Sequence, residues 1–211
     1  MGSEDFIPVV DNTNYLPTLQ PKYVLLGMLD DYLGRSPSLS QSTVETFYPK
    51  ERRVAEIFMS YLCAAGLNAG GEPNLQVHDT GHVDVLCAYA REQIDHHYVP
   101  DPKMFRPSLK LSRAIFPEIS RGQYRPDEVD PRFSYLYGVY LRYGSQEPFS
   151  VRLANSVHRV ELIKEFLVDL NAKWASHKFT IRTAPVCNDI AFEPDEVLGG
   201  LLLVAIQERR T

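Results

Sequence analysis

Four of the chain's six histidines lie between Val77 and Asp101, among aspartates and glutamates. Two histidines four residues apart on one helix can bind the same metal ion, as in the H-E-x-x-H motif of zinc enzymes. His78 and His82 have this spacing, and Asp79 lies between them. The candidate metal ligands are therefore His78, Asp79 and His82, and their chemistry would be metal-dependent hydrolysis of a phosphate-bearing substrate.

The surrounding residues favour a structural helix over a metal site. We expect this helix to cover Thr80–His97 and to begin near Asp79, which places His78 outside it. His96 lies about 21 Å along the helix axis from His82, too far for one ion to join them. The buried stripe of this helix would comprise Val83, Leu86, Cys87, Ala90 and Ile94. We therefore predict a structural role, with no metal and no cofactor.

A tyrosine-rich segment, Arg132–Gly144, contains candidate residues for binding a partner. Tyrosine and arginine are favoured at protein interfaces because they combine rigid area with a polar end. We expect the segment to form a strand, in which the same residues could instead pack a sheet or line a pocket with His158 and Arg182. The candidate binding residues from this segment are Tyr135, Tyr137, Tyr140 and Arg142.

A second candidate binding region is the basic stretch that follows Asp101. Its lysines and arginines are spaced at three, four and three residues, so on a helix they would share one face. Such a face suits an acidic partner or a phosphate-bearing ligand, although acidic neighbours could neutralise it within the fold. The basic residues are Lys103, Arg106, Lys110 and Arg113, and we take Lys110 and Arg113 as binding candidates.

Composition narrows the class of protein. The 211 residues carry a formal net charge of −5, with 44% apolar and 23% charged residues. This balance is typical of a globular protein with a hydrophobic core, and the negative charge argues against a nucleic-acid partner. No apolar run approaches the roughly 18 residues of a membrane span. The three cysteines are odd in number and include no C-x-x-C pair, which favours a reducing, cytoplasmic location.

Hydrophobic periodicity predicts helices along the chain and strands after residue 131. The expected helices are Pro21–Leu33, Lys50–Ala65, Thr80–His97 and Leu153–Trp174, with a short one between Pro107 and Phe116. The expected strands are Arg132–Gly144, His177–Ala184, Asp189–Pro194 and Gly200–Arg209. The first and last of these strands have a helical alternative, which for the last would start at Pro194.

These elements predict an α+β fold with a mostly helical N-terminal half and a C-terminal β-α-β-β-β half. The C-terminal half would contain an antiparallel sheet, because short turns join its consecutive strands. We expect residues 1–211 to form a single domain, and a subdivision near residues 99–131, where prolines recur, stays open. The buried stripe of the longest helix comprises Leu153, Val157, Val160, Phe166, Leu167, Leu170 and Trp174.

The sequence favours a non-catalytic function. It contains no G-x-S-x-G or S-x-x-K nucleophile motif, no P-loop and no G-x-G-x-x-G. We therefore predict a protein-interaction module, such as an inhibitor, adaptor or immunity-type protein, with a protein partner and no membrane. The alternative is an enzyme that hydrolyses a phosphate-bearing substrate, with a metal at the histidine cluster.

Overall fold

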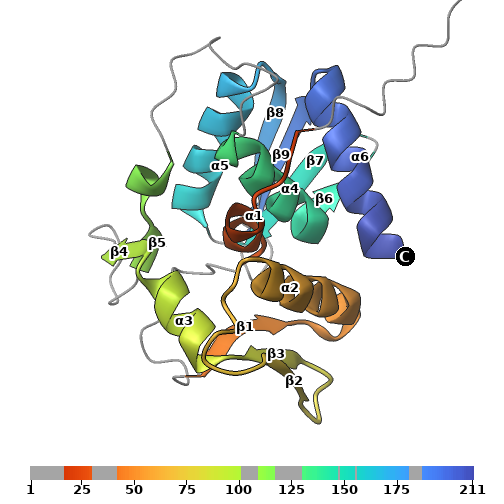
Figure 1. The fold of residues 1–211 in the computed structure, drawn as a ribbon. Coiled ribbons are helices and arrows are strands. Elements are labelled where there is room, and N and C mark those ends of the chain that lie inside the picture. The colour runs from red at the N-terminus through yellow and green to blue at the C-terminus, as the bar shows by residue number, and fades with distance from the viewer. Residues whose placement is uncertain are drawn as a thin grey trace, which may run out of the picture.

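The computed structural model describes residues 17–29, 42–100, 109–116, 130–146, 148–154, 156–180 and 187–211, without the side chains of residues 157, 174 and 175. Its helices and antiparallel sheets form an α+β fold, which confirms the predicted fold class. The two larger sheets have three and four strands. In Figure 1 the three-stranded sheet lies with helix α2 at one end of the molecule, and the four-stranded sheet lies with helices α4, α5 and α6 at the other. Helix α1 lies between them.

The N-terminal half contains two small antiparallel sheets in the order β1-β3-β2 and β4-β5. Its helices are α1 Pro21–Met28, α2 Arg52–Ala64 and α3 Ala88–Asp95, with 3-10 turns η2 Pro49–Glu51 and η3 Arg113–Ile115. Its strands are β1 Thr43–Phe47, β2 Asn74–Val77, β3 Val83–Leu86, β4 Tyr98–Pro100 and β5 Leu109–Leu111. Helix α2 covers the three-stranded sheet, and the ring of Phe58 packs on that of Phe47 at 5.4 Å.

The C-terminal half contains one antiparallel sheet in the order β6-β7-β9-β8, which confirms the sheet expected after Arg132. Its strands are β6 Gly144–Ser145, β7 Ser150–Ala154, β8 Lys173–Thr180 and β9 Cys187–Glu193. Its helices are α4 Pro131–Tyr143, α5 Val157–Asp169 and α6 Glu196–Arg210. The buried face of the sheet carries Val151, Leu153, Ile190 and Phe192, and Arg152 and Asp189 lie on the other face.

Helix α4 is the centre of the fold, and the strand expected at Arg132–Gly144 is wrong. Every residue from Pro131 to Arg142 is buried. Asp130 begins the helix by accepting a hydrogen bond from the Arg132 backbone N–H at 2.9 Å, and a proline follows at the first helical position. Alternating tyrosines are compatible with a helix here because α4 is covered on all sides.

Three other expected elements need correction. The first part of the expected helix Thr80–His97 is strand β3, whose alternate residues Val83 and Val85 are buried, and only its second part is helix α3. The expected strand Gly200–Arg209 is helix α6, capped by Asp195 through the Leu198 N–H, so the helical alternative is confirmed. The short helix expected before Phe116 is replaced by β5 and η3.

The expected helices that start at Pro21, Lys50 and Leu153 are confirmed with shorter bounds. Helix α1 ends at Met28 because Leu29 has an extended backbone, and the residues from 30 to 41 lie outside the described part. Residues at both ends of Leu153–Trp174 join strands β7 and β8. Of the predicted buried stripe, Leu153, Val160, Phe166, Leu167 and Leu170 are buried, whereas the side chains of residues 157 and 174 are not described.

None of the described helices is long and apolar enough to cross a membrane.

Candidate functional site

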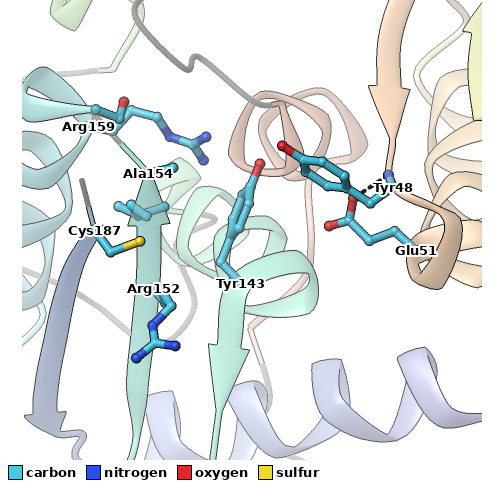
Figure 2. A pocket seen from close by; sticks show the side chains of 9 residues that line it. Tyr48, Glu51, Tyr143, Arg152, Ala154, Arg159 and Cys187 are labelled. Carbon is cyan, nitrogen blue, oxygen red and sulfur yellow. Dashed lines mark hydrogen bonds between the residues drawn. The ribbon is translucent and has the colours of Figure 1, made fainter. Parts of the chain in front are cut away.

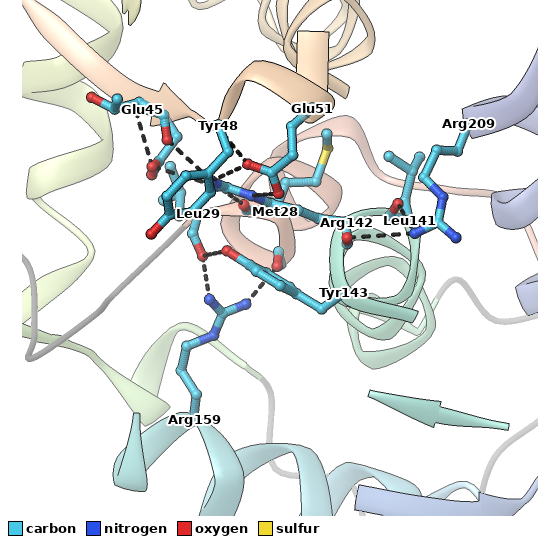
Figure 3. Close-up of polar contacts among 12 residues, drawn as sticks. Met28, Leu29, Glu45, Tyr48, Glu51, Leu141, Arg142, Tyr143, Arg159 and Arg209 are labelled. Carbon is cyan, nitrogen blue, oxygen red and sulfur yellow. Dashed lines mark hydrogen bonds and ion pairs between the residues drawn. The ribbon is translucent and has the colours of Figure 1, made fainter. Parts of the chain in front are cut away.

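Two arginines bind the C-terminal end of helix α1 (Figure 3). The last carbonyl groups of a helix have no partner within it and carry the negative end of the helix dipole. Arg142 of α4 donates to the Met28 carbonyl at 2.7 Å. Arg159 of α5 donates to the carbonyls of Leu29 and Gly27. The end of α1 is thereby held by side chains of two other helices, α4 and α5.

Arg142 also joins α4 to the N-terminal sheet. Its guanidinium is fully buried and lies 3.4 Å from a Glu45 carboxylate oxygen and 3.2 Å from one of Glu51. It donates to the Thr46 carbonyl at 3.1 Å and stacks over the Phe47 ring. Such a charge is tolerated in the interior because carboxylates and carbonyls surround it.

A cavity of about 250 Å³ lies beside this cluster, between the end of β1, the start of α5 and the strands β7 and β9 (Figure 2). Its wall is therefore assembled from segments that are distant in the sequence. The residues that line it are Tyr48, Glu51, Tyr143, Arg152, Leu153, Ala154, Ser156, Arg159 and Cys187.

The cavity wall is mainly apolar but contains two arginines. Arg159 is buried, with 1% exposed, and its guanidinium lies 5.1 Å from the centre of the Tyr143 ring. The Arg152 side chain is 72% exposed, and Asp189 binds it at 2.6 Å. This carboxylate raises the pKa of Arg152. Both arginines line the cavity, and each guanidinium is fixed by a contact within the fold, Arg152 with Asp189 and Arg159 with the carbonyls at the end of α1.

Ser156 brings a buried hydroxyl group to the cavity wall. It is the N-cap of α5, a position where a serine hydroxyl usually accepts a hydrogen bond from the first turn of the helix, but its side chain makes no such bond. The residue is 3% exposed, and its Oγ has no hydrogen-bond partner among the described residues. A buried hydroxyl without a partner costs free energy, and the positive end of the α5 dipole lies beside it. The arrangement suits an anion.

The tyrosines that were predicted to bind a partner lie in the interior of the protein. Tyr135, Tyr137 and Tyr140 are buried on α4. Tyr137 donates to a Glu208 carboxylate at 2.5 Å, and burial, followed by this carboxylate, raises its pKa above the ordinary value. Tyr140 donates to the Ser145 carbonyl. Internal packing accounts for all three, and hydrogen bonds add to it at Tyr137 and Tyr140, so a binding role for these tyrosines and for Arg142 stays a prediction. Tyr143, from the same segment, does reach the cavity.

The basic stretch does not form the expected helical face. Lys110 lies in strand β5 and Arg113 in the turn η3, while Lys103 and Arg106 lie outside the described residues. Arg113 binds Glu165 of α5 at 2.6 Å. A role for Lys110 and Arg113 in binding a partner stays a prediction. Of the two residues expected to share a pocket with the tyrosines, Arg182 lies outside the described part and His158 is not in the cavity wall.

The residues His78, Asp79 and His82 form a turn, so the helical spacing on which a metal site was based is wrong. The turn joins β2 to β3: the His78 N–H donates to the His82 carbonyl at 2.9 Å, and the Gly81 N–H donates to that of His78. His78 Nε2 pairs with Asp84 at 2.9 Å, and the His82 ring pairs with the Thr80 hydroxyl. The described residues contain no group of three or more side chains placed to hold a metal.

Sequence reasoning missed Arg152, Ser156, Arg159 and Cys187. One signal was present, because Arg159 lies one turn before Ile163 in the apolar stripe of α5, and an arginine at such a core position indicates a buried polar contact. The other three gave no local signal.

Comparison of the chain with protein-family models, curated proteins and solved structures found no match.

Proposed function

We propose that this protein is a non-catalytic interaction module that binds a carboxylate of a protein partner in the cavity beside Ser156. One observation carries the proposal, namely the buried Ser156 hydroxyl that lines the cavity without a partner among the described residues. It stands at the N-terminus of α5, where an incoming anion is stabilised by the helix dipole.

The charges of the wall support an anionic ligand. Arg152 and Arg159 both line the cavity, and a guanidinium forms strong hydrogen bonds with carboxylates. Glu51 is the acidic residue of the wall, and its carboxylate faces Arg142 and the Tyr48 N–H, at 3.2 and 2.9 Å. Its negative charge is therefore partly compensated before any ligand binds, because Arg142 faces Glu45 as well.

The size of the cavity favours a protein partner over a drug-sized small molecule or a cofactor. Pockets for drug-sized ligands and cofactors measure roughly 300–1,000 Å³, whereas this cavity has about 250 Å³. One side chain or one chain end fits such a volume, with Tyr48 and Tyr143 as aromatic walls. An acidic side chain and a C-terminal carboxylate offer the same chemistry.

Glu51 and Tyr143 of the cavity wall already make structural contacts, which supports a binding role without catalysis. Glu51 holds Arg142, and the Tyr143 hydroxyl donates to the Leu29 carbonyl at 3.4 Å. Groups held in structural contacts position a ligand but do not readily exchange protons with it. A cytoplasmic location fits this proposal, because none of the three cysteines forms a disulfide in the structure.

Calorimetry with small carboxylates tests the proposal. N-acetylphenylalanine represents a chain end, and N-acetylaspartate amide represents an acidic side chain. We expect at least one of them to bind with a Kd of the order of millimolar, as fits a ligand of this size, and the corresponding uncharged amide to bind at least about tenfold more weakly. Ser156→Ala and Arg152→Gln should each weaken the binding.

A matched control uses Arg113, an exposed arginine that is also paired with a carboxylate but does not line the cavity. Arg113→Gln should bind the carboxylates as the wild type does. Equal binding of acid and amide, or an equal loss in Arg113→Gln, would contradict the proposal. Binding and hydrolysis of phenyl phosphate would instead support the alternative, a hydrolase of phosphate-bearing substrates.

A further inference from the structure

Cys187 brings a thiol to the wall of the cavity. It is the first residue of β9, it is partly exposed, and it forms no disulfide. In the sheet it lies opposite Ala154 of β7 and Thr180 of β8, so its side chain shares the outer face with theirs. In Figure 2 the sulfur lies among the side chains that surround the cavity.

Two positive charges flank this thiol. Along β9 the next residue on the same face is Asp189, which lies opposite Arg152 on one side and Lys178 on the other. Arg152 and Lys178 are therefore the diagonal neighbours of Cys187, and both are exposed. The two cations and one carboxylate leave a net positive charge next to the sulfur, which attracts anionic reagents.

The same cavity contains the buried Ser156 hydroxyl, an independent indication that an anionic group belongs there. A small anionic molecule drawn to the cavity is therefore brought close to the thiol. The thiolate is the form of cysteine that reacts.

We propose that Cys187 is a site of reversible thiolation by anionic low-molecular-weight disulfides. The Cys187 thiol loses its proton to solvent, and the thiolate attacks one sulfur of the disulfide RSSR. A bond forms between Cys187 and that sulfur as the old S–S bond breaks, and the second sulfur leaves as RS⁻ and takes up a proton. Cys187 is oxidised to the mixed disulfide, and one RSH is the reduced product.

The consequence for binding rests on the proposed function. The attached anionic group would occupy the cavity and compete with the partner's carboxylate. A reducing thiol would reverse the reaction by attacking the mixed disulfide, so the module would bind its partner only in its reduced state.

The test compares two thiols of the native protein with two disulfides of opposite charge. Cys63 is exposed on α2, and the residues one helical turn before it, Met59 and Ser60, carry no charge. Anionic glutathione disulfide and cationic cystamine are added in separate reactions, and peptide mass spectrometry gives the rate at each cysteine. We expect the ratio of the Cys187 rate to the Cys63 rate to be about tenfold higher with glutathione disulfide than with cystamine.

Arg152→Gln and Lys178→Gln should each lower the ratio for glutathione disulfide, and high salt should do the same. Equal ratios for the two disulfides, or ratios that neither substitution changes, would overturn the inference. This measurement does not use the carboxylate probes, so it separates a failure of the thiolation site from a failure of the proposed function. If N-acetylphenylalanine and N-acetylaspartate amide do not bind the unmodified protein, the proposed function fails, and the two rate ratios still decide the inference.

Discussion

Gly138 of α4 lies directly against the carbonyl oxygen of Val24 in α1, so that any β-carbon on Gly138 would overlap that oxygen. Gly27 stands in the same relation to the Tyr135 carbonyl on the other helix. The two helices therefore cross with their backbones in contact. This crossing brings the C-terminal end of α1 to the arginines that hold it.

Gly138→Ala should lower the free energy of unfolding by about 1–3 kcal/mol or more, because the overlap is with backbone and neither helix can yield easily. Urea denaturation measures the change. Gly199→Ala in α6 is the matched control, since its β-carbon would lie 3.4 Å from Pro194, an ordinary contact. It should raise stability by roughly 0.5–1 kcal/mol through helix propensity. A loss at Gly199 as large as that at Gly138 would contradict this account.

Arg142→Met should lower the free energy of unfolding by about 3–5 kcal/mol, since it leaves Glu45 and Glu51 without the buried charge that they face. The comparison is Arg113→Gln, which breaks an exposed ion pair with Glu165 and should cost no more than about 1 kcal/mol. Both values come from the same urea titration. Similar losses in the free energy of unfolding for the two variants would mean that Arg142 does not hold the N-terminal and C-terminal halves of the protein together.

His97 should make the protein less stable as the pH falls. Burial, and then the charges of Lys22 and His96, lower its pKa in the folded state below the ordinary 6.5. The unfolded chain therefore binds the proton more readily, so the contribution of His97 is complete above pH 6.5 and declines as the pH falls from there toward the folded pKa. His97→Gln should reduce this decline in a series of urea titrations. An identical decline in the variant would assign it to other groups.

Hydrophobic periodicity predicted the secondary structure correctly where a segment follows a single clear pattern. Helix α5 shows an apolar stripe with charges on the other side, and its buried residues Val160, Phe166 and Leu167 follow from that pattern. Strand β9 shows an equally clear pattern, in which every second residue is buried. Helix α4 is buried on all sides and shows no stripe. Its glycine argued for a strand, yet Gly138 is the residue that lets α1 approach.

The cavity could not be predicted in the same way, because its residues come together only through the fold. Tyr48, Arg152 and Cys187 are far apart in the sequence, and the strands of Arg152 and Cys187 become neighbours only when the sheet forms. Similarly, the spacing of His78 and His82 predicted a shared helical face, but the hydrogen bonds of a hairpin turn decided their geometry. Only Arg159 showed its role locally, as a charge at a core position of a helix.

The most direct test of the cavity as the binding site is NMR mapping with ¹⁵N-labelled protein and N-acetylphenylalanine. We predict that saturable chemical-shift changes are largest for the backbone amides of Ser156, Ala154 and Tyr143, and that Ser156→Ala reduces them. The amides of His78 and Arg113, which do not line the cavity, should stay unchanged. No saturable change, or changes centred on the turn at His78 or on Arg113, would contradict the account.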